Sequence, residues 1–259
     1  MIEVMVRQQA SGDKVAARRT RNEAIQAGQK DAQSGLYRNL AIADAKAGDY
    51  CAAFQALRAL KGAAERNRTL VEIAKIQAER GETAIAHTTL AAIVGAASRD
   101  EAMVAIGSYQ AKHGNIAGAL RTAATMKDPV HRTVVLRYVA GAQSRMKRGA
   151  AARTTLKQLV EIAASIPIGG GTDTIVYLEN AELSAKLGYR DLAINCYERA
   201  RAAAMRYAEV EYQGSLLRDI AKSEGKVGLT KVAVSTATEL PTPFLKAWWL
   251  LGLAEGLQP

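Results

Sequence analysis

Four segments of the chain carry one pattern at a spacing of 33 residues: LAIADAKAGDYCAAFQAL (residues 40–57), IAKIQAERGETAIAHTTL (73–90), IGSYQAKHGNIAGALRTA (106–123) and VAGAQSRMKRGAAARTTL (139–156). Each segment begins with a large apolar residue followed by a small one, and each has alanine 13 positions after its start. A pattern that recurs at a fixed period of about 20 to 50 residues is typical of a solenoid, whose repeats pack only on their neighbours. The stretch 36–159 therefore predicts a repeat architecture.

Each repeat is expected to fold as two antiparallel helices. In the first copy a helix over residues 36–47 ends at Gly48, and Asp49 caps a second helix over residues 50–61. Glycine suits the left-handed position after a helix, and aspartate accepts hydrogen bonds from the free N–H groups of the next helix. The same punctuation recurs at Gly81–Glu82 and Gly114–Asn115. In the fourth copy Lys147 takes the glycine position, which predicts that its first helix runs on for half a turn or ends differently.

The pattern extends over nearly the whole chain, so the prediction is one all-α domain over residues 1–259 with about six units and a capping helix. After the fourth copy Pro167 and three glycines at 169–171 break the period, which favours a flexible joint. Trp248 and Trp249 are expected to cover the end of the stack. The predicted segments are a degenerate or clipped unit (1–33), four regular units (34–164), the joint (165–174), two longer units (175–241) and the capping helix (242–259).

These columns resemble the tetratricopeptide repeat, whose first helix carries W-x2-L-G-x2-Y and whose second helix carries A-x3-F. The L-G positions hold Leu40–Ala41, Ile73–Ala74, Ile106–Gly107 and Val139–Ala140. The A-x3-F positions hold Ala53/Leu57, Ala86/Leu90, Ala119/Ala123, Ala152/Leu156 and Ala193/Tyr197. The chain departs from the family at the Tyr position, which holds Gln or Asp, and at the second-helix aromatic, which is mostly aliphatic. The resemblance implies a right-handed α-solenoid of antiparallel helix pairs, with a concave groove lined mainly by the first helix of each unit.

Basic residues dominate the positions that this resemblance assigns to the groove. Of 24 positions, 10 are Lys or Arg and only Glu79 and Glu182 are acidic, a steeper ratio than the 35 to 25 of the whole chain. The net charge of +10 likewise favours an acidic partner. The residues predicted to bind that partner are Arg38, Lys46, Lys75, Lys112, Arg137, Arg145, Arg218 and Lys222.

The leading functional hypothesis is a non-enzymatic adaptor, a scaffold for protein–protein interaction whose basic groove holds an acidic peptide or protein surface. The alternative is binding of single-stranded RNA or another nucleic acid in the same groove. Single-strand readers usually place aromatic side chains among the cations for base stacking, and the predicted lining has none. A small-molecule substrate is not expected.

The sequence offers no set of residues typical of a catalytic or metal site. His87, His113 and His131 fall at different phases of their units, with no Cys or carboxylate at ligand spacing. The glycines at 169–171 do not form a phosphate-binding GxxxxGK[ST] motif and no strand precedes them. The prediction is therefore a protein that is not an enzyme, with no catalytic residues, no metal and no cofactor.

A column of glutamines is the most unusual recurrent feature: Gln8, Gln77, Gln110 and Gln143. One interpretation is a polar ladder in which each Gln hydrogen-bonds a neighbouring helix or a loop carbonyl. The other is that the glutamines line a groove and bind a peptide backbone or bases.

Cys51 and Cys196 are far apart in sequence, so a disulfide between them is not expected and nothing indicates an oxidising compartment. No signal peptide and no run of about 18 apolar residues is visible. The expected location is cytoplasmic by default, or periplasmic or otherwise exported if a signal peptide was removed.

Overall fold

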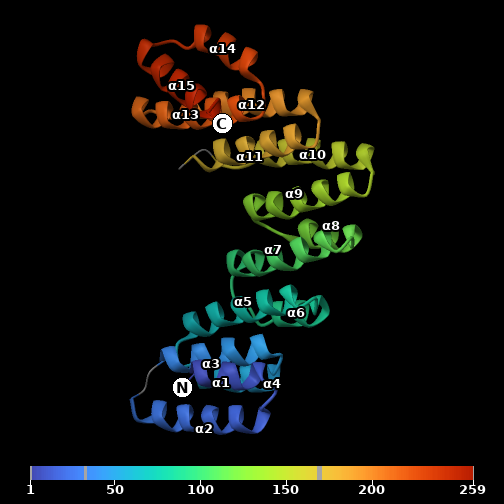
Figure 1. The fold of residues 1–259 in the computed structure, drawn as a ribbon, viewed down its shortest axis with the longest axis vertical. Helices are drawn as coiled ribbons and strands as arrows, with labels where there is room; N and C mark the ends of the chain where they lie inside the picture. Colours follow the sequence, from blue (N-terminus) through green and yellow to red (C-terminus); the bar gives the residue numbers. More distant parts are fainter. Residues whose placement is uncertain (1, 32–33, 168–170, 259) are drawn as a thin grey trace. The chain divides into compact units, whose positions relative to one another are not determined.

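The structure is a computed structural model that describes residues 2–31, 34–167 and 171–258. These residues form 15 α-helices and no strand (Figure 1). The helices fall into two compact units, Met1–Asp128 and Pro129–Pro259. Unit 1 contains α1 (Ile2–Ala10), α2 (Lys14–Asp31), α3 (Ser34–Ala47), α4 (Tyr50–Ala59), α5 (Ala63–Glu79), α6 (Thr83–Leu90), α7 (Ala96–Lys112) and α8 (Ile116–Thr125). Unit 2 contains α9 (Pro129–Arg145), α10 (Gly149–Ala163), α11 (Thr172–Lys186), α12 (Arg190–Ala204), α13 (Val210–Lys226), α14 (Thr230–Glu239) and α15 (Pro243–Gly256).

The helices pack in adjacent pairs, as the repeat predicts. Odd-numbered helices are called first helices below, and even-numbered ones second helices. Within the described residues each helix contacts only helices one or two positions away along the chain, which is the contact pattern of a helical repeat. Part of the predicted joint, residues 168–170, lies outside the described residues.

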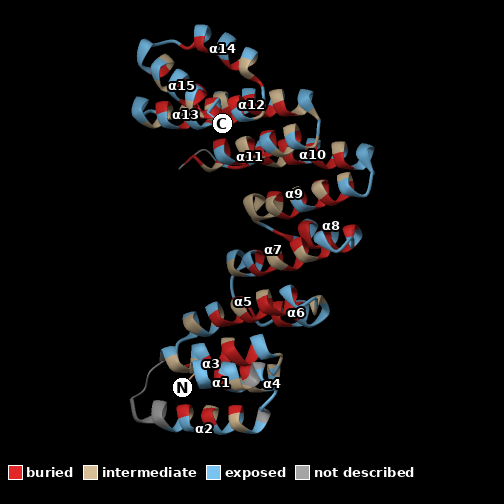
Figure 2. Cartoon of the chain, viewed as in Figure 1, coloured by how far each residue is buried: buried red, intermediate tan, exposed pale blue. Residues whose placement is uncertain are grey.

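The repeated columns form the core of each unit. The large apolar column (Leu40, Ile73, Ile106, Val139) and the alanine column (Ala53, Ala86, Ala119, Ala152) are both completely buried. Figure 2 shows buried residues along the faces where first and second helices meet. Alanine at the contact lets two helices approach closely, so the small residues set the packing distance within each pair.

The turns between paired helices are built as predicted at the glycines. Gly48, Gly81 and Gly114 all have φ near 82–83°, the left-handed region that glycine adopts without strain. Lys147 has φ 58° and makes the same turn, with its N–H donating to Ser144 and that of Arg148 donating to Gln143. The helix ends at Arg145, at the same repeat position as α5 and α7, so both predicted alternatives, an extension by half a turn and a different ending, are wrong. Lys147 adopts the left-handed conformation at a cost of about 1–2 kcal/mol because the two turn hydrogen bonds close only in that geometry.

The last first helix, α15, packs unusually closely on α13. A Cβ atom placed on Gly252 would lie 2.1 Å from the Arg218 carbonyl oxygen, and one on Gly256 would lie 2.2 Å from that of Lys222. Trp249 is completely buried, and its indole N–H donates to the Ala233 carbonyl of α14 at 2.7 Å. The two glycines therefore bring α15 into backbone contact with α13 while Trp249 fills the space toward α14.

Candidate functional site

The predicted groove cations fall into two groups in the structure. The first group lies along the first helices and contacts glutamates of the next first helix. In unit 1 the Nζ of Lys75 in α5 lies 2.5 Å from Glu101 of α7 and 3.1 Å from Glu72 of its own helix. Burial alone would lower the pKa of Lys75, but its hydrogen bonds to Glu101 and Glu72 raise it above the ordinary value. Lys75 is therefore a partner of α7.

Unit 2 contains two contacts of the same kind. Arg137 of α9 pairs with Glu179 of α11. Arg218 of α13 donates from Nε to Glu255 of α15 at 3.0 Å, and Lys222 Nζ lies 3.0 Å from the other oxygen of Glu255. Hydrogen bonds from Arg218 and then Lys222 lower the pKa of Glu255. These three cations link successive first helices, and much of their charge is already balanced by glutamate.

The second group lies in the last turns of the first helices and is exposed. Lys46 and Lys112 end α3 and α7 in unit 1, and Arg145 ends α9 in unit 2. Lys186 and Lys226 occupy the same place in α11 and α13. We call these five residues the helix-end cations. Arg38, the remaining predicted residue, is exposed near the start of α3.

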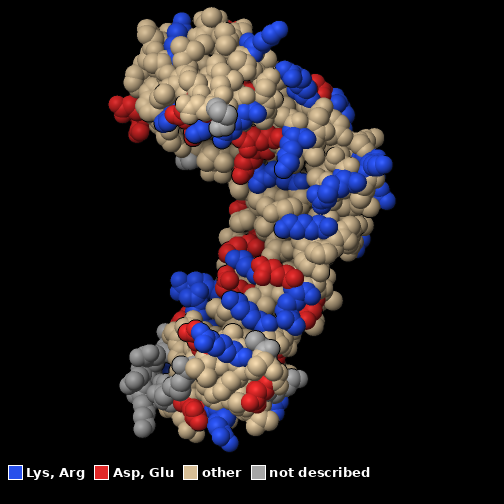
Figure 3. All heavy atoms as spheres, in the orientation of Figure 1, with Lys and Arg blue, Asp and Glu red and all other residues tan. Residues whose placement is uncertain are grey.

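Unit 2 presents three helix-end cations on consecutive first helices. Among the described residues Arg145, Lys186 and Lys226 have no carboxylate partner, in contrast to Arg137, Arg218 and Lys222. Figure 3 shows Lys and Arg side chains gathered over α9–α12. Both acidic lining positions, Glu79 and Glu182, are exposed, and Glu182 accepts a hydrogen bond from Ser223 at 2.7 Å.

The glutamine column has a structural role in the core. In each of four pairs the Gln side-chain oxygen accepts a hydrogen bond of 2.8–2.9 Å from a threonine 12 residues later, on the second helix. The pairs are Gln8–Thr20, Gln77–Thr89, Gln110–Thr122 and Gln143–Thr155. The polar-ladder interpretation is therefore confirmed in its main point, a hydrogen bond from each Gln to a neighbouring helix. The recurrence of Thr at this fixed offset was a signal available in the sequence.

Two units replace the glutamine by a buried carboxylate. Asp44 binds Arg21 of α2 at 2.9 Å, and Glu224 binds Arg201 of α12. In both cases the arginine lies 23 residues earlier, on the preceding second helix. Burial raises the pKa of Glu224 to about 7 despite the nearby Arg201, and its second oxygen has no hydrogen-bond partner.

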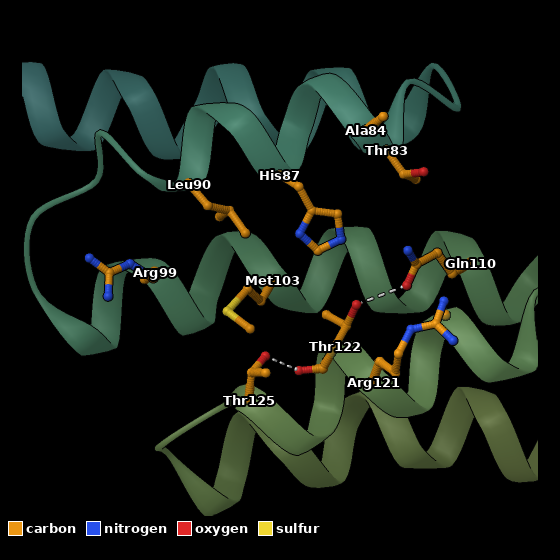
Figure 4. Close-up of a pocket in the computed structure, with 11 residues that line it drawn as sticks. Thr83, Ala84, His87, Leu90, Arg99, Met103, Gln110, Arg121, Thr122 and Thr125 are labelled. Atoms are coloured by element: carbon orange, nitrogen blue, oxygen red, sulfur yellow. Dashed lines mark hydrogen bonds between the residues drawn. The ribbon is translucent and has the colours of Figure 1, made fainter.

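A pocket of about 620 Å³ opens between α6 and α8, with α7 as its floor (Figure 4). Within the described residues α6, which has 8 residues, makes no contact with α8. Arg99 lies at the end of the pocket near Leu90 and Met103, and Arg121 lies at the opposite end near Gln110. The sequence did not predict this pocket, because its residues come from three helices at unrelated positions of the repeat.

His87 lies between the two ends of the pocket, with its ring directed away from α6. Burial lowers the pKa of His87. His113 instead stacks on Tyr109 with ring centroids 3.8 Å apart, and His131 belongs to α9. Within the described ranges, no group of three His, Cys, Asp or Glu side chains is arranged to hold a metal ion, and no helix is long and apolar enough to cross a membrane.

Comparisons with protein-family models, with curated proteins and with solved structures returned no match.

Proposed function

We propose that the chain is a non-enzymatic, tetratricopeptide-like right-handed solenoid that acts as a protein-interaction scaffold. Its partner is an acidic peptide or protein surface, bound by the exposed cations at the ends of the first helices. The observation that carries this proposal is the set Arg145, Lys186 and Lys226, which repeats an unbalanced positive charge on three consecutive first helices. A row of exposed cations steers an acidic ligand toward the surface and forms charge-assisted hydrogen bonds once it is bound.

Pairing with glutamate changes which predicted residues should matter most. Reversing Arg137 or Lys222 to Glu would place two carboxylates together and weaken the contacts between first helices. Any loss of binding would then have two explanations. The helix-end cations are free of this problem, because they have no described ion pair to break in unit 2.

The test compares two triple variants of equal charge in unit 2. One combines Arg145→Glu, Lys186→Glu and Lys226→Glu, and the control combines the exposed second-helix changes Lys157→Glu, Arg199→Glu and Lys231→Glu. The probe is a fluorescein-labelled peptide of alternating Glu and Gly, followed by anisotropy at several salt concentrations. The first variant should lose at least about tenfold in affinity and the control much less, because only the first removes direct contacts.

Thermal unfolding of both variants is measured in parallel, because a cation in the last turn also stabilises its helix by about 0.3–1 kcal/mol. Equal losses in the two variants would contradict the proposal, since they would show a response to net charge alone. A single-stranded oligouridine is the second probe. Submicromolar binding that weakens steeply with salt and is lost in the first variant would favour the nucleic-acid alternative.

A further inference from the structure

The α6–α8 pocket carries one guanidinium group at each end (Figure 4). These groups belong to Arg99 and Arg121, and none of the residues that line the pocket is Asp or Glu. Arg121 forms no hydrogen bond or ion pair with another described residue. Arg99 donates one hydrogen bond, from Nη2 to the Ile93 carbonyl at 3.0 Å, and its other N–H groups remain available. Two guanidinium groups without a carboxylate favour an anionic occupant.

The Arg121 end of the pocket gathers further hydrogen-bond donors. The Gln110 side-chain oxygen is occupied by Thr122 at 2.9 Å, so the amide N–H groups are the part of Gln110 left to bind a ligand. Thr83 is the first residue of α6 and lies at this end in Figure 4. Glu82 does not cap α6 with its side chain, because its carboxylate contacts Tyr50 and Arg80 instead. The free N–H groups of the first turn of α6 add a partial positive charge here.

The pocket also has an apolar wall toward Arg99. Leu90 and Met103 are buried at 6% and 5% exposure and lie toward Arg99. A volume of about 620 Å³ is within the usual range for small-molecule sites, which combine an apolar lining with a few convergent polar groups. An inorganic anion alone would leave this apolar part unused.

We propose that the α6–α8 pocket binds an organic anion, whose phosphate or carboxylate group lies at Arg121, Gln110 and Thr83 and whose apolar body packs on Leu90 and Met103. Arg99 is placed to contact a second anionic group at the far end. This site lies between second helices of unit 1, whereas the proposed scaffold surface of unit 2 lies at the ends of first helices. The inference therefore does not depend on the proposed function.

The experiment follows Met103 in the full chain by methyl NMR with ¹³C-labelled methionine, with the signal assigned through Met103→Leu. The probes are phenyl phosphate, benzoate, inorganic phosphate and neutral benzyl alcohol. Phenyl phosphate or benzoate should shift the Met103 signal saturably, and inorganic phosphate and benzyl alcohol should bind at least about tenfold more weakly, since each lacks one half of the recognised chemistry. The relative affinities of the first two probes distinguish a phosphate site from a carboxylate site.

Arg121→Gln should weaken binding at least about tenfold, because a charge-assisted hydrogen bond is lost. Arg58→Gln, an exposed arginine of α4, is the matched control and should leave binding unchanged. Ala84→Leu, which fills the pocket from α6, should abolish the shift even if Arg121→Gln affects folding. The inference is overturned if neither organic anion binds saturably, if Arg121→Gln and Ala84→Leu bind as the parent does, or if inorganic phosphate binds as tightly as phenyl phosphate.

Discussion

At the scale of single residues, one column of the repeat decides how polar groups are accommodated in the core. Gln and Thr pair across four helix hairpins, and where the column holds Asp44 or Glu224 the bonding partner is an arginine from the preceding second helix. A buried polar group without a partner is unfavourable, so each residue at this position requires a matching residue on a neighbouring helix.

Thr155→Val tests this pairing in the fourth unit. The change removes the donor to Gln143 and leaves a buried amide oxygen without a partner, since Thr155 and Gln143 are both buried. We expect the free energy of unfolding to fall by about 1–3 kcal/mol, measured by urea denaturation. Thr154→Val is the matched control: Thr154 is exposed and donates only to the Ala150 carbonyl of its own helix. Similar losses of stability in the two variants would contradict a stabilising role for the buried Thr155–Gln143 hydrogen bond.

Glu224→Gln tests the carboxylate form of the same column. Because the folded pKa is raised from 4.5 to about 7, the native state keeps a proton that the unfolded chain releases between these values. The contribution of Glu224 to the free energy of unfolding therefore falls by an amount on the order of 3 kcal/mol as the pH rises through this window. Above the window this contribution is constant. In the variant, the new amide can accept a hydrogen bond from Thr236, which lies at the usual offset.

The measurement is urea denaturation at pH 5 and pH 8. Relative to the parent, the Glu224→Gln protein should gain stability between the two pH values. Gln143→Glu is the reciprocal change. Relative to the parent it should lose stability between pH 5 and pH 8, because the new buried carboxylate has no arginine partner and its pKa is raised. If the free energies of unfolding of the parent and of Glu224→Gln change in parallel between the two pH values, the titration of Glu224 does not cause the pH dependence.

At the scale of elements, the sequence pattern predicted the helices because their determinants are local. Gly48 and Asp49 end one helix and begin the next, and α4 starts at Tyr50 as predicted. The ion pairs between successive first helices were not predictable from the same period. Lys75–Glu101, Arg137–Glu179 and Arg218–Glu255 have sequence separations of 26, 42 and 37, so no common spacing identifies them.

The candidate sites also divide into features that the sequence repeat predicted and features that it did not. The positions of the cations on first helices followed from the repeat, but their pairing depends on how far each first helix is rotated against the next. The α6–α8 pocket depends on how three separate helices, α6, α7 and α8, are placed in space. Neither the ion pairing of the cations nor the pocket is encoded in one segment of the sequence. The Gln–Thr pairs are encoded in one segment, because their two residues always lie 12 positions apart.

Gly252→Ala tests the close approach of α15 to α13. The added Cβ would lie 2.1 Å from the backbone oxygen of Arg218, so the two helices must separate. We expect a loss of at least about 1–3 kcal/mol in the free energy of unfolding, because overpacking forces backbone shifts. Gly35→Ala in α3 is the control: no atom lies within 4 Å of its added Cβ, so it should be neutral or stabilising. Equal effects of the two changes would rule out close helix packing as the cause.

At the scale of the whole molecule, contacts limited to near neighbours predict that stability is distributed along the chain. In such arrays the free energy of unfolding is approximately a sum of repeat terms and nearest-neighbour terms, so a local defect acts first on its own surroundings. Both tryptophans, Trp248 and Trp249, lie in α15 of unit 2. Tryptophan fluorescence therefore reports on that end of the chain, while far-UV circular dichroism reports on all helices.

Thr89→Val removes the donor to Gln77 in unit 1, where both residues are buried. Such a loss costs about 1–3 kcal/mol, so the circular-dichroism transition should move to lower urea and broaden. The fluorescence transition should keep its midpoint, because the tryptophans belong to the other unit. Thr155→Val, in unit 2, is the matched change and should shift the fluorescence midpoint. If Thr89→Val moved both transitions equally, the chain would unfold as a single cooperative body, and neighbour-limited contacts would not govern its stability.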